Sequence, residues 1–280
     1  MGNRSFIVGD AGGTGTQWRV VNDKDIKQFE TVGFNAYTHN LDDLKTSIIQ
    51  TFGGEIDKNT PVFFYAAGID TKEQKKSTKT FLATIFGESV FVENDLVGVA
   101  RALCGKEEGN VCILGTGSNA CFYNGSVVNK VSASLGYVLG DEGSGAYLGK
   151  KLMMGVFREQ FSKSIIQAFQ KEFDLTSHDV IQRIYHQPRP NHFLASFGSF
   201  ILQHKNHPEI FRLVQKSFHD FFDAFFVGKN HLAAPFHFSG SIAFHFSDIL
   251  REVGSERGIY IKNIIQSPIA GLVLYHQKYD

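Results

Sequence analysis

The chain has 280 residues, enough for one large domain or two, and its 28 basic side chains balance 28 acidic ones. Without an excess of positive charge, the composition excludes nucleic acid as the expected partner. No stretch reaches the roughly 18 consecutive apolar residues that a membrane span requires. The cysteines Cys104, Cys112 and Cys121 show no paired spacing. We therefore expect a soluble, cytoplasmic protein with reduced cysteines and no membrane partner.

A strand, a loop and a second strand open the chain, and a turn and a third strand follow. The apolar residues 6–8 lead into Gly9-Asp10-Ala11-Gly12-Gly13-Thr14-Gly15-Thr16, and strands are predicted over 18–21 and 26–31. Residues 111–131 repeat this plan. A strand over 111–114 leads into Gly115-Thr116-Gly117-Ser118-Asn119, and a strand, an Asn124-Gly125 turn and a last strand follow. The repetition predicts two structurally similar halves.

Helices and strands alternate between these two openings. Apolar spacing predicts helices over 41–52, 72–86 and 96–103, and strands over 62–66 and 90–92. This alternation after a strand meander predicts a mixed sheet flanked by helices.

The second half of the chain is richer in helices. Helical spacing runs over 148–173, a capping box starts a helix at 176–179, and a proline-containing break follows at 186–190. Further helices are predicted over 193–204 and 208–226, then a strand over 236–238 and a helix from Pro268. The 27 phenylalanines are expected to fill the core.

The two Gly/Thr-rich loops are candidate phosphate-binding sites; we call residues 9–16 the first loop and residues 115–118 the second loop. Glycine lets backbone N–H groups approach a ligand closely, and Thr and Ser hydroxyls add donors. Asp10 is a candidate Mg²⁺ ligand, since this cation prefers oxygen ligands and keeps water. The alternative is that both loops are ordinary hairpin turns. Their similar topological positions favour phosphate binding.

Two common nucleotide-binding motifs are excluded. No Gly-x-x-x-x-Gly-Lys-Ser/Thr sequence occurs, so this is not a P-loop protein. Residues 115–120 match the dinucleotide fingerprint, but that motif must open a helix. Here a strand and a hairpin turn are predicted instead, which excludes a Rossmann site.

Asp95 is the candidate general base. Phosphoryl transfer to an alcohol needs a carboxylate that positions the hydroxyl and accepts its proton. Asp95 follows the strand over 90–92 and precedes a helix, a location favoured for active-site groups in α/β sheets. The residue could equally cap that helix.

A second acidic cluster lies in Gly140-Asp141-Glu142-Gly143-Ser144-Gly145. Its two carboxylates could bind sugar hydroxyls through charge-assisted hydrogen bonds. They could also favour the N-terminus of the next helix, and both interpretations stay open. His204 and His207 are three residues apart, but without a third ligand they predict no metal site.

Taken together, these segments resemble the acetate and sugar kinase, Hsp70 and actin superfamily, and within it the N-acetylglucosamine kinase-like branch of the BadF/BadG/BcrA/BcrD ATPase family. The matching segments are residues 9–16, 93–95, 114–119 and 139–145, with weaker matches at 239–241 and 268–271. The resemblance implies an α/β fold of two ribonuclease H-like (actin-like ATPase) domains with a nucleotide cleft between them. The implied domains are residues 1–107, joined by a C-terminal helix over 268–280, and residues 108–267 with a helical insertion.

The resemblance also implies a function and its residues. It implies an ATP- and Mg²⁺-dependent kinase that phosphorylates an amino sugar, N-acetylglucosamine at its 6-hydroxyl, with Asp95 as the base and Asp10 as the metal ligand. The implied nucleotide ligands are Gly12, Gly13, Thr14, Thr16, Gly115, Thr116, Gly117, Ser118, Gly240 and Ser241. The implied sugar ligands are Asn35, Asp95, Gly136, Asp141 and Glu142.

This chain departs from the family's pattern at one point. Sugar kinases of the family often carry Gly-Trp-Gly shortly before Gly-Asp-Glu-Gly-Ser, where this chain has Ser134-Leu135-Gly136. The missing tryptophan changes a pocket wall and leaves the identity of the sugar open.

Two other functions are weighed on the same fold. One is a non-catalytic sensor of a sugar or nucleotide. The other is an ATPase activator of an iron–sulfur dehydratase, whose cluster-binding cysteine pattern this chain does not match. The expected partner is a small-molecule sugar, and a homodimer is compatible with the sequence.

Overall fold

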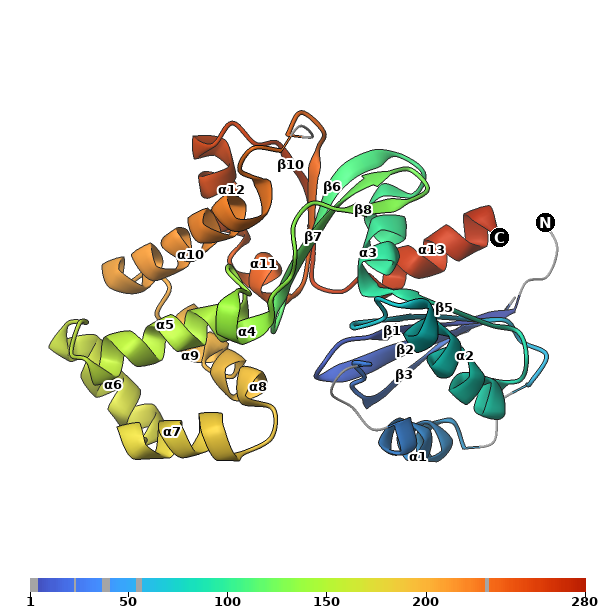
Figure 1. The fold of residues 1–280 in the computed structure, drawn as a ribbon, viewed down its shortest axis with the longest axis horizontal. Coiled ribbons are helices and arrows are strands. Elements are labelled where there is room, and N and C mark those ends of the chain that lie inside the picture. Colours follow the sequence, from blue (N-terminus) through green and yellow to red (C-terminus); the bar gives the residue numbers. More distant parts are fainter. Residues whose placement is uncertain (1–4, 23, 37–40, 54–56, 230–231) are drawn as a thin grey trace. The chain divides into compact units, whose positions relative to one another are not determined.

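The chain divides into two compact units in the computed structural model, which describes residues 5–22, 24–36, 41–53, 57–229 and 232–280 (Figure 1). Unit 1 consists of Met1–Glu107, Tyr123–Val128 and Ser267–Asp280, and unit 2 of Glu108–Phe122 and Asn129–Gln266. Within the described ranges, no helix combines the length and the apolar character that crossing a membrane requires.

Unit 1 is built on a five-stranded sheet in the order β3-β2-β1-β4-β5. An antiparallel meander forms from β1 (Phe6–Ala11), β2 (Gly15–Val21) and β3 (Ile26–Val32). β4 (Val62–Ala66) and β5 (Val90–Asn94) continue the sheet parallel to β1. The carboxyl ends of β1, β4 and β5 therefore meet at one edge of the sheet.

Helices cover both faces of this sheet. α1 (Leu41–Phe52) and α2 (Lys72–Phe86) pack on one face, over a core that includes Trp18 and Phe64. α3 (Asp95–Cys104) and α13 (Ile269–Tyr279) pack on the other face, together with Val8. Because side chains alternate along a strand, each buried strand supplies residues to both cores. The predicted mixed sheet flanked by helices is confirmed for this unit.

A buried polar chain fastens the C-terminal helix to unit 1. Arg101 Nη1 donates to Tyr65 Oη at 2.8 Å, and Tyr65 Oη lies 2.9 Å from Nε2 of His276, which is 2% exposed. Since the Asp280 carboxylate can only accept, Nδ1 of His276 donates to it, and Nε2 of the neutral ring accepts from the tyrosine hydroxyl. Burial lowers the pKa of His276, which agrees with a neutral ring.

Unit 2 repeats the sheet of unit 1. Its strands are β6 (Glu108–Leu114), β7 (Ser118–Asn124), β8 (Val128–Lys130), β9 (Phe236–Ser239) and β10 (Ile261–Ile265). They are ordered β10-β9-β6-β7-β8, and β9 runs parallel to both of its neighbours. In both sheets the first strand of the unit is central, with its meander on one side and its parallel strands on the other. This confirms the predicted repetition.

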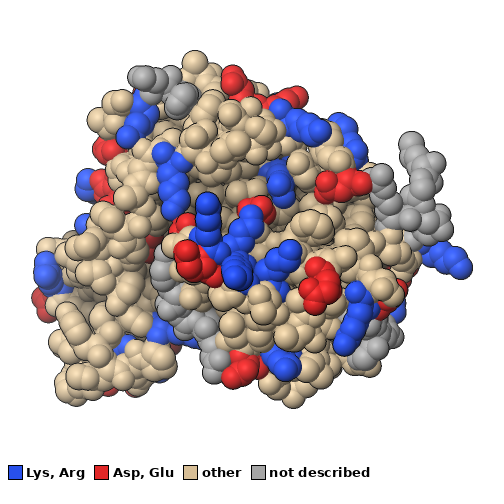
Figure 2. Space-filling view, turned by 45° about the vertical axis from the view of Figure 1, so that its right-hand side comes forward, with Lys and Arg blue, Asp and Glu red and all other residues tan. Residues whose placement is uncertain are grey.

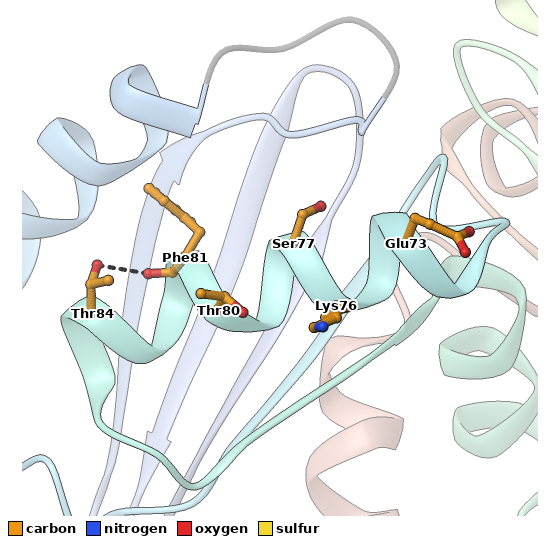
Figure 3. A pocket seen from close by; sticks show the side chains of 6 residues that line it. All are labelled: Glu73, Lys76, Ser77, Thr80, Phe81 and Thr84. Atoms are coloured by element: carbon orange, nitrogen blue, oxygen red, sulfur yellow. Dashed lines mark hydrogen bonds between the residues drawn. The ribbon is translucent and has the colours of Figure 1, made fainter.

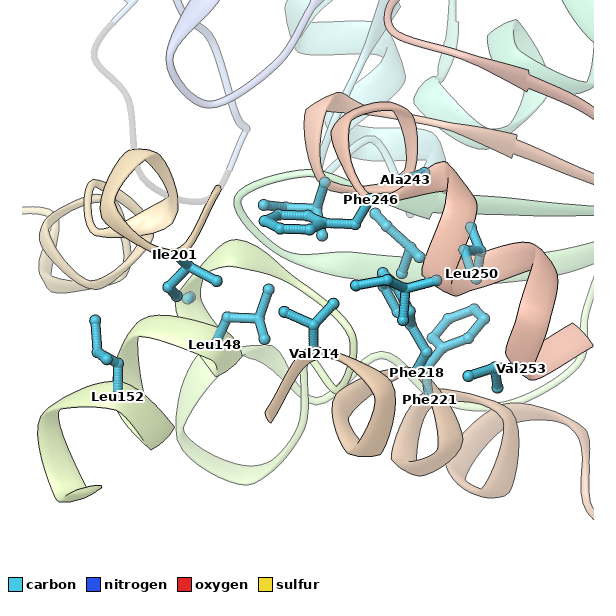
Figure 4. Packing of buried hydrophobic residues seen from close by; sticks show 14 of the residues in the cluster. Leu148, Leu152, Ile201, Val214, Phe218, Phe221, Ala243, Phe246, Leu250 and Val253 are labelled. Atoms are coloured by element: carbon cyan, nitrogen blue, oxygen red, sulfur yellow. The ribbon is translucent and has the colours of Figure 1, made fainter. Parts of the chain in front are cut away.

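The helices of unit 2 enclose a phenylalanine-rich core (Figure 4). Phe218 and Phe221 of one long helix meet Phe246 and Leu250, and all four side chains are buried. The helices are α4 (Gly136–Leu139), α5 (Gly145–Phe157), α6 (Lys163–Phe173), α7 (Ser177–His186), α8 (Pro190–Ala195), α9 (Gly198–Gln203), α10 (Pro208–Phe226), α11 (Ser241–His245) and α12 (Ser247–Glu256). The phenylalanines thus fill the core, as expected.

The helical run predicted over 148–173 is divided, and this prediction was wrong. α5 ends at Phe157, Glu159 adopts a positive φ of 52°, and α6 begins after Ser162. Glu209 of α10 accepts hydrogen bonds from the backbone N–H of Ser162 at 3.0 Å and from its hydroxyl at 2.7 Å. This contact between distant residues fixes the break. The predicted helix over 193–204 is likewise split into α8 and α9, whereas the capping box of Thr176 and Asp179 is confirmed.

We predict that Tyr65→Phe lowers the free energy of unfolding by roughly 1–3 kcal/mol. The substitution removes only the hydroxyl, which leaves the buried His276 Nε2 and the Arg101 guanidinium without this partner. Urea denaturation measures the change. The matched control is Tyr185→Phe, whose side chain is 76% exposed and which should change stability by less than about 0.5 kcal/mol. Equal effects of the two substitutions would contradict the role of the buried chain.

Candidate functional site

The site residues predicted in the first half of the chain gather at the carboxyl edge of the unit 1 sheet. Asp10 lies at the end of β1, and Asp95 follows β5 as the first residue of α3. Asn35 forms a parallel bridge with Ala67, which directly follows β4, and Ala67 N–H donates to Ala11 O at 3.3 Å. The ends of three neighbouring strands thus bring the two carboxylates and Asn35 to one edge.

The segment that follows β3 supports the first loop. Gly12 N–H donates to Gly15 O at 3.0 Å, and Phe34 N–H donates to Gly12 O at 3.0 Å. A Cβ on Gly33 would lie 2.6 Å from the carbonyl oxygens of Gly12 and Gly13, so only glycine fits there. The N–H groups of Gly13 and Thr14 donate to no other residue in the described part of the chain. Sequence analysis did not identify Gly33. The signal that could have found it is a glycine two positions after a predicted strand.

The side chain of Thr16 has a different role from the predicted one. Thr16 is fully buried, and its hydroxyl donates to Val32 O at 2.8 Å. The hydroxyl therefore ties β2 to β3 and is not presented to a ligand. Thr14, by contrast, is exposed at the tip of the loop.

Asp10 is buried, and the negative charge of Asp95 acts on it. Burial and, second, the negative charge of Asp95 raise the pKa of Asp10 to about 7. Two carboxylates this close resist joint ionisation unless a cation or a proton lies between them.

The N-terminus of α3 is capped by Asn94, the residue before Asp95. Asn94 is the N-cap: its side-chain oxygen accepts from Leu96 N–H at 2.9 Å, and its amide donates to Ile69 O at 3.2 Å. Asp95 Oδ1 shares the same N–H group at 2.8 Å. Since Asn94 already satisfies the helix end, α3 does not depend on Asp95 for its cap.

The second loop is clamped by the N-terminus of α5. Gly145 N–H donates to Gly115 O at 2.8 Å, and Ala146 N–H donates to Thr116 O at 3.0 Å. Gly115 N–H in turn donates to Gly117 O at 3.0 Å. The carbonyls of Gly115, Thr116 and Gly117 thus all accept hydrogen bonds. Among the described residues, no acceptor is found for the N–H groups of Thr116 and Gly117. In both loops, hydrogen bonds from neighbouring segments occupy carbonyl groups, and N–H groups remain to bind a ligand.

Asp141 lies beneath the second loop. Its side chain is buried, and Oδ1 accepts from Ser118 N–H at 3.2 Å. Burial raises the pKa of this carboxyl. The helix-capping alternative is not its role, because Ser144 caps α5 by accepting from Tyr147 N–H.

The remaining predicted residues of unit 2 also lie near the second loop. Gly240 has φ +117°, and a Cβ there would lie 2.3 Å from Leu114 O. Ser241 is exposed as the first residue of α11. Glu142 is half-buried next to Asp141, and Gly136 opens α4 with φ +70°. These residues therefore lie near the carboxyl ends of the parallel strands β6 and β9.

A surface groove of about 500 Å³ lies elsewhere, along one face of α2 (Figure 3). It is lined by Glu73, Lys76, Ser77, Thr80, Phe81 and Thr84, none of which sequence analysis singled out. On the face displayed in Figure 2, basic and acidic side chains are interspersed, as the balanced composition leads one to expect. Neither feature favours a second site.

The raised pKa of Asp10 predicts a pH-dependent stability. Between the ordinary value of 3.8 and about 7, the folded protein keeps the proton that the unfolded chain has released. Stability therefore falls as pH rises through this window and is level above it. Without metal or nucleotide, Asp10→Asn should gain roughly 2 kcal/mol relative to wild type between pH 5.5 and pH 8. Urea denaturation at both pH values measures this gain. Asp43→Asn, an exposed change in α1, should show none, and parallel pH dependence of wild type and Asp10→Asn would contradict the shift.

Comparisons with known proteins agree with this fold. No protein-family model matches the chain. The solved structure of a putative N-acetylglucosamine kinase from Porphyromonas gingivalis is 36% identical, covers 98% of this chain and 99% of that one, and has a TM-score of 0.92. A ROK family glucokinase from Streptomyces griseus, solved with glucose and AMPPNP, covers 98% of each chain at 16% identity and a TM-score of 0.60, a likeness that shows the fold alone.

A curated protein is also similar over a shorter stretch. The N-acetyl-D-glucosamine kinase of Dictyostelium discoideum is 32% identical over 95 residues, which span 33% of this chain and 30% of that protein. The likeness to the Porphyromonas gingivalis structure extends over nearly the full length of both chains. This chain therefore belongs to the N-acetylglucosamine kinase-like family of sugar kinases, on the actin-like ATPase fold.

Proposed function

We propose that this protein transfers the terminal phosphate of ATP to the 6-hydroxyl of N-acetylglucosamine. The observation that carries the proposal is the meeting of Asp10 and Asp95 at the carboxyl edge of the unit 1 sheet, where burial and, second, the charge of Asp95 raise the pKa of Asp10. Phosphoryl transfer to an alcohol uses one carboxylate for the metal and one for the hydroxyl. The names of the two N-acetylglucosamine kinase relatives support this sugar.

Asp95 is proposed as the general base. It begins α3, and its backbone position is set by β5 and by the Asn94 cap. A carboxylate held on a rigid element can orient the sugar hydroxyl and accept its proton as the oxygen–phosphorus bond forms. Binding energy then goes into alignment of the hydroxyl with the phosphate, and the carboxylate needs only a modest basicity.

The carboxylate oxygens of Asp10 are suitable ligands for Mg²⁺. The described residues contain no group of three or more His, Cys, Asp and Glu side chains that could hold a metal. An ion bound by Asp10 would therefore complete its shell with water and phosphate oxygens, as Mg²⁺ commonly does. When bound, the ion would neutralise charge on the phosphates. Asp10 must be ionised to serve as its ligand, so the raised pKa predicts that metal binding weakens as the pH falls below about 7.

The two loops are proposed to bind the phosphates through backbone N–H groups. In the first loop these donors belong to Gly13 and Thr14, and in the second loop to Thr116 and Gly117. The hydroxyl of Ser118 is buried, and among the described residues it has no hydrogen-bond partner. A phosphate oxygen would satisfy such a donor. Gly12, Gly115, Gly240 and Ser241 are proposed as further nucleotide contacts.

The sugar is proposed to bind at five residues: Asn35, Asp95, Gly136, Asp141 and Glu142. Asn35 shares its sheet edge with Asp95, which makes it the most direct candidate for a second hydroxyl of the same sugar. Leu135 stands where the family often carries tryptophan, and its side chain is 58% exposed. This smaller apolar wall is compatible with an amino sugar bearing an acyl group.

Asp95→Asn should lower kcat by roughly 10²–10⁴-fold while it changes the KM for ATP little, because the amide keeps the shape but cannot accept the proton. A coupled assay of ADP release with N-acetylglucosamine measures both constants. Glu88→Gln, an exposed change just before β5, is the control and should keep wild-type kcat. A wild-type kcat in Asp95→Asn would remove Asp95 from the mechanism.

The position of phosphorylation is tested with the acceptor itself. N-acetylglucosamine should stimulate ADP release, and 6-deoxy-N-acetylglucosamine should bind without stimulating it, because it lacks the accepting oxygen. Phosphorus–proton coupling in the product should place the phosphate on carbon 6. Turnover of the deoxy sugar, or calorimetric binding of N-acetylglucosamine without any turnover, would contradict the proposal; the second result would indicate a sensor.

A further inference from the structure

The short helix α4 has little apolar packing of its own. All four of its residues lie within the described ranges, and none of them is buried. Val138 and Leu139 are 67% and 72% exposed, and only Tyr137 of this helix packs partly against the core of unit 2. A single helical turn costs more conformational entropy than its hydrogen bonds return. The position of α4 must therefore be fixed by contacts with other elements.

Lys150 of α5 bonds directly to α4. Its Nζ donates to Tyr137 O at 3.0 Å, near the middle of the short helix. α5 is well anchored, because Leu148 and Leu152 are buried in the core of unit 2 (Figure 4). Lys150 itself is half-buried, and its ammonium also lies 5.2 Å from the ring centroid of Tyr147. The lysine therefore connects α4 to a packed element.

The charge of Lys150 acts on the acidic segment that follows α4. Burial and, second, the charge of Lys151 lower the pKa of Lys150. The negative charges of Glu142 and Asp141 act in the opposite direction. Burial raises the pKa of Asp141, and the hydrogen bond from Ser118 N–H and the positive charge of Lys150 oppose this rise. A cation near two adjacent carboxyl groups reduces their mutual repulsion.

α4 joins residues that are proposed to bind the sugar. Gly136 is its first residue, and Asp141 and Glu142 follow shortly after its last residue. Gly140 N–H donates to Gly136 O at 2.8 Å, which closes the turn between them. A displacement of α4 would therefore move proposed sugar ligands on both of its sides.

We propose that Lys150 is a positioning residue for the sugar site and acts by holding α4 in place through the Tyr137 carbonyl. The residues that it places are Gly136, Asp141 and Glu142. The inference rests on the proposed function, since it takes these three residues to bind N-acetylglucosamine. In the described part of the chain, the Lys150 side chain bonds to neither Gly/Thr-rich loop. Its effect should therefore be confined to the acceptor.

Substitution of Lys150 should affect the two substrates differently. Lys150→Met keeps most of the side-chain length but removes the donor and the charge, and it should raise the KM for N-acetylglucosamine roughly tenfold. The KM for ATP should change less than about threefold. Lys150→Arg keeps a positive charge and N–H donors, and it should return the KM for the sugar to within about threefold of wild type. Lys151→Met is the matched control: this neighbour lies 5.0 Å from the same Tyr147 ring and should leave both KM values unchanged.

Hydrogen exchange tests the contact itself and needs no turnover. The peptide over residues 136–142 should exchange roughly tenfold faster in Lys150→Met than in wild type, because α4 opens more often. It should exchange at the wild-type rate in Lys151→Met. Faster exchange with an unchanged KM for the sugar would overturn the inference, and so would a raised KM with unchanged exchange or an equal rise in the KM for ATP.

Calorimetric titration with N-acetylglucosamine alone separates this inference from the proposed function. Binding by the wild type without any ADP release would contradict the proposed kinase activity, while roughly tenfold weaker binding by Lys150→Met would still support the role of Lys150. Equal sugar affinity of wild type and Lys150→Met would overturn the inference even in an active kinase. Absence of sugar binding by the wild type would overturn it as well.

Discussion

The constraint on which the candidate site depends is the parallel alignment of β1, β4 and β5. Because these strands run in one direction, their carboxyl ends share an edge, and the residues that leave them converge there. Asp10 and Asp95 meet at this edge although they lie 85 positions apart in the chain. Burial of Asp10 and, second, the negative charge of Asp95 raise the pKa of Asp10 to about 7. A negative charge next to a buried carboxyl is typical of sites that bind a cation. An ion pair with a basic residue would have relieved this repulsion.

The two loops show how a fold prepares donors for an anion. In each loop, neighbouring segments hold the carbonyls: Phe34 N–H holds that of Gly12, and the start of α5 holds those of Gly115 and Thr116. N–H groups are left over on both loops in the described part of the chain. Gly33 and Gly240 permit the close backbone approaches that this requires. The glycines outside the loops therefore matter as much as those within them.

Local sequence patterns were sufficient to predict most helices and strands. Features that depend on contacts between distant residues were missed. The predicted bounds of 41–52, 62–66 and 72–86 are those of α1, β4 and α2, because apolar spacing and caps are local signals. The break between α5 and α6 depends on Glu209, which lies 47 positions from Ser162. The two loops and Asp141 were found from their glycine-rich sequence, and Asp95 from its place between a strand and a helix. The inward direction of the Thr16 hydroxyl and of Asp141 depends on packing that periodicity does not encode. Asp95 was likewise a candidate cap in the sequence, whereas in the structure Asn94 is the N-cap of α3.

The central claim is that the sheet edge of unit 1 holds both the metal ligand and the base. A crystal structure with N-acetylglucosamine, Mg²⁺ and AMPPNP tests it most directly. The account predicts that the sugar 6-oxygen lies within about 3.2 Å of an Asp95 carboxylate oxygen, and that the Mg²⁺ shell includes Asp10 directly or through one water. A sugar whose 6-hydroxyl faces away from Asp95, or a metal bound away from Asp10, would contradict it.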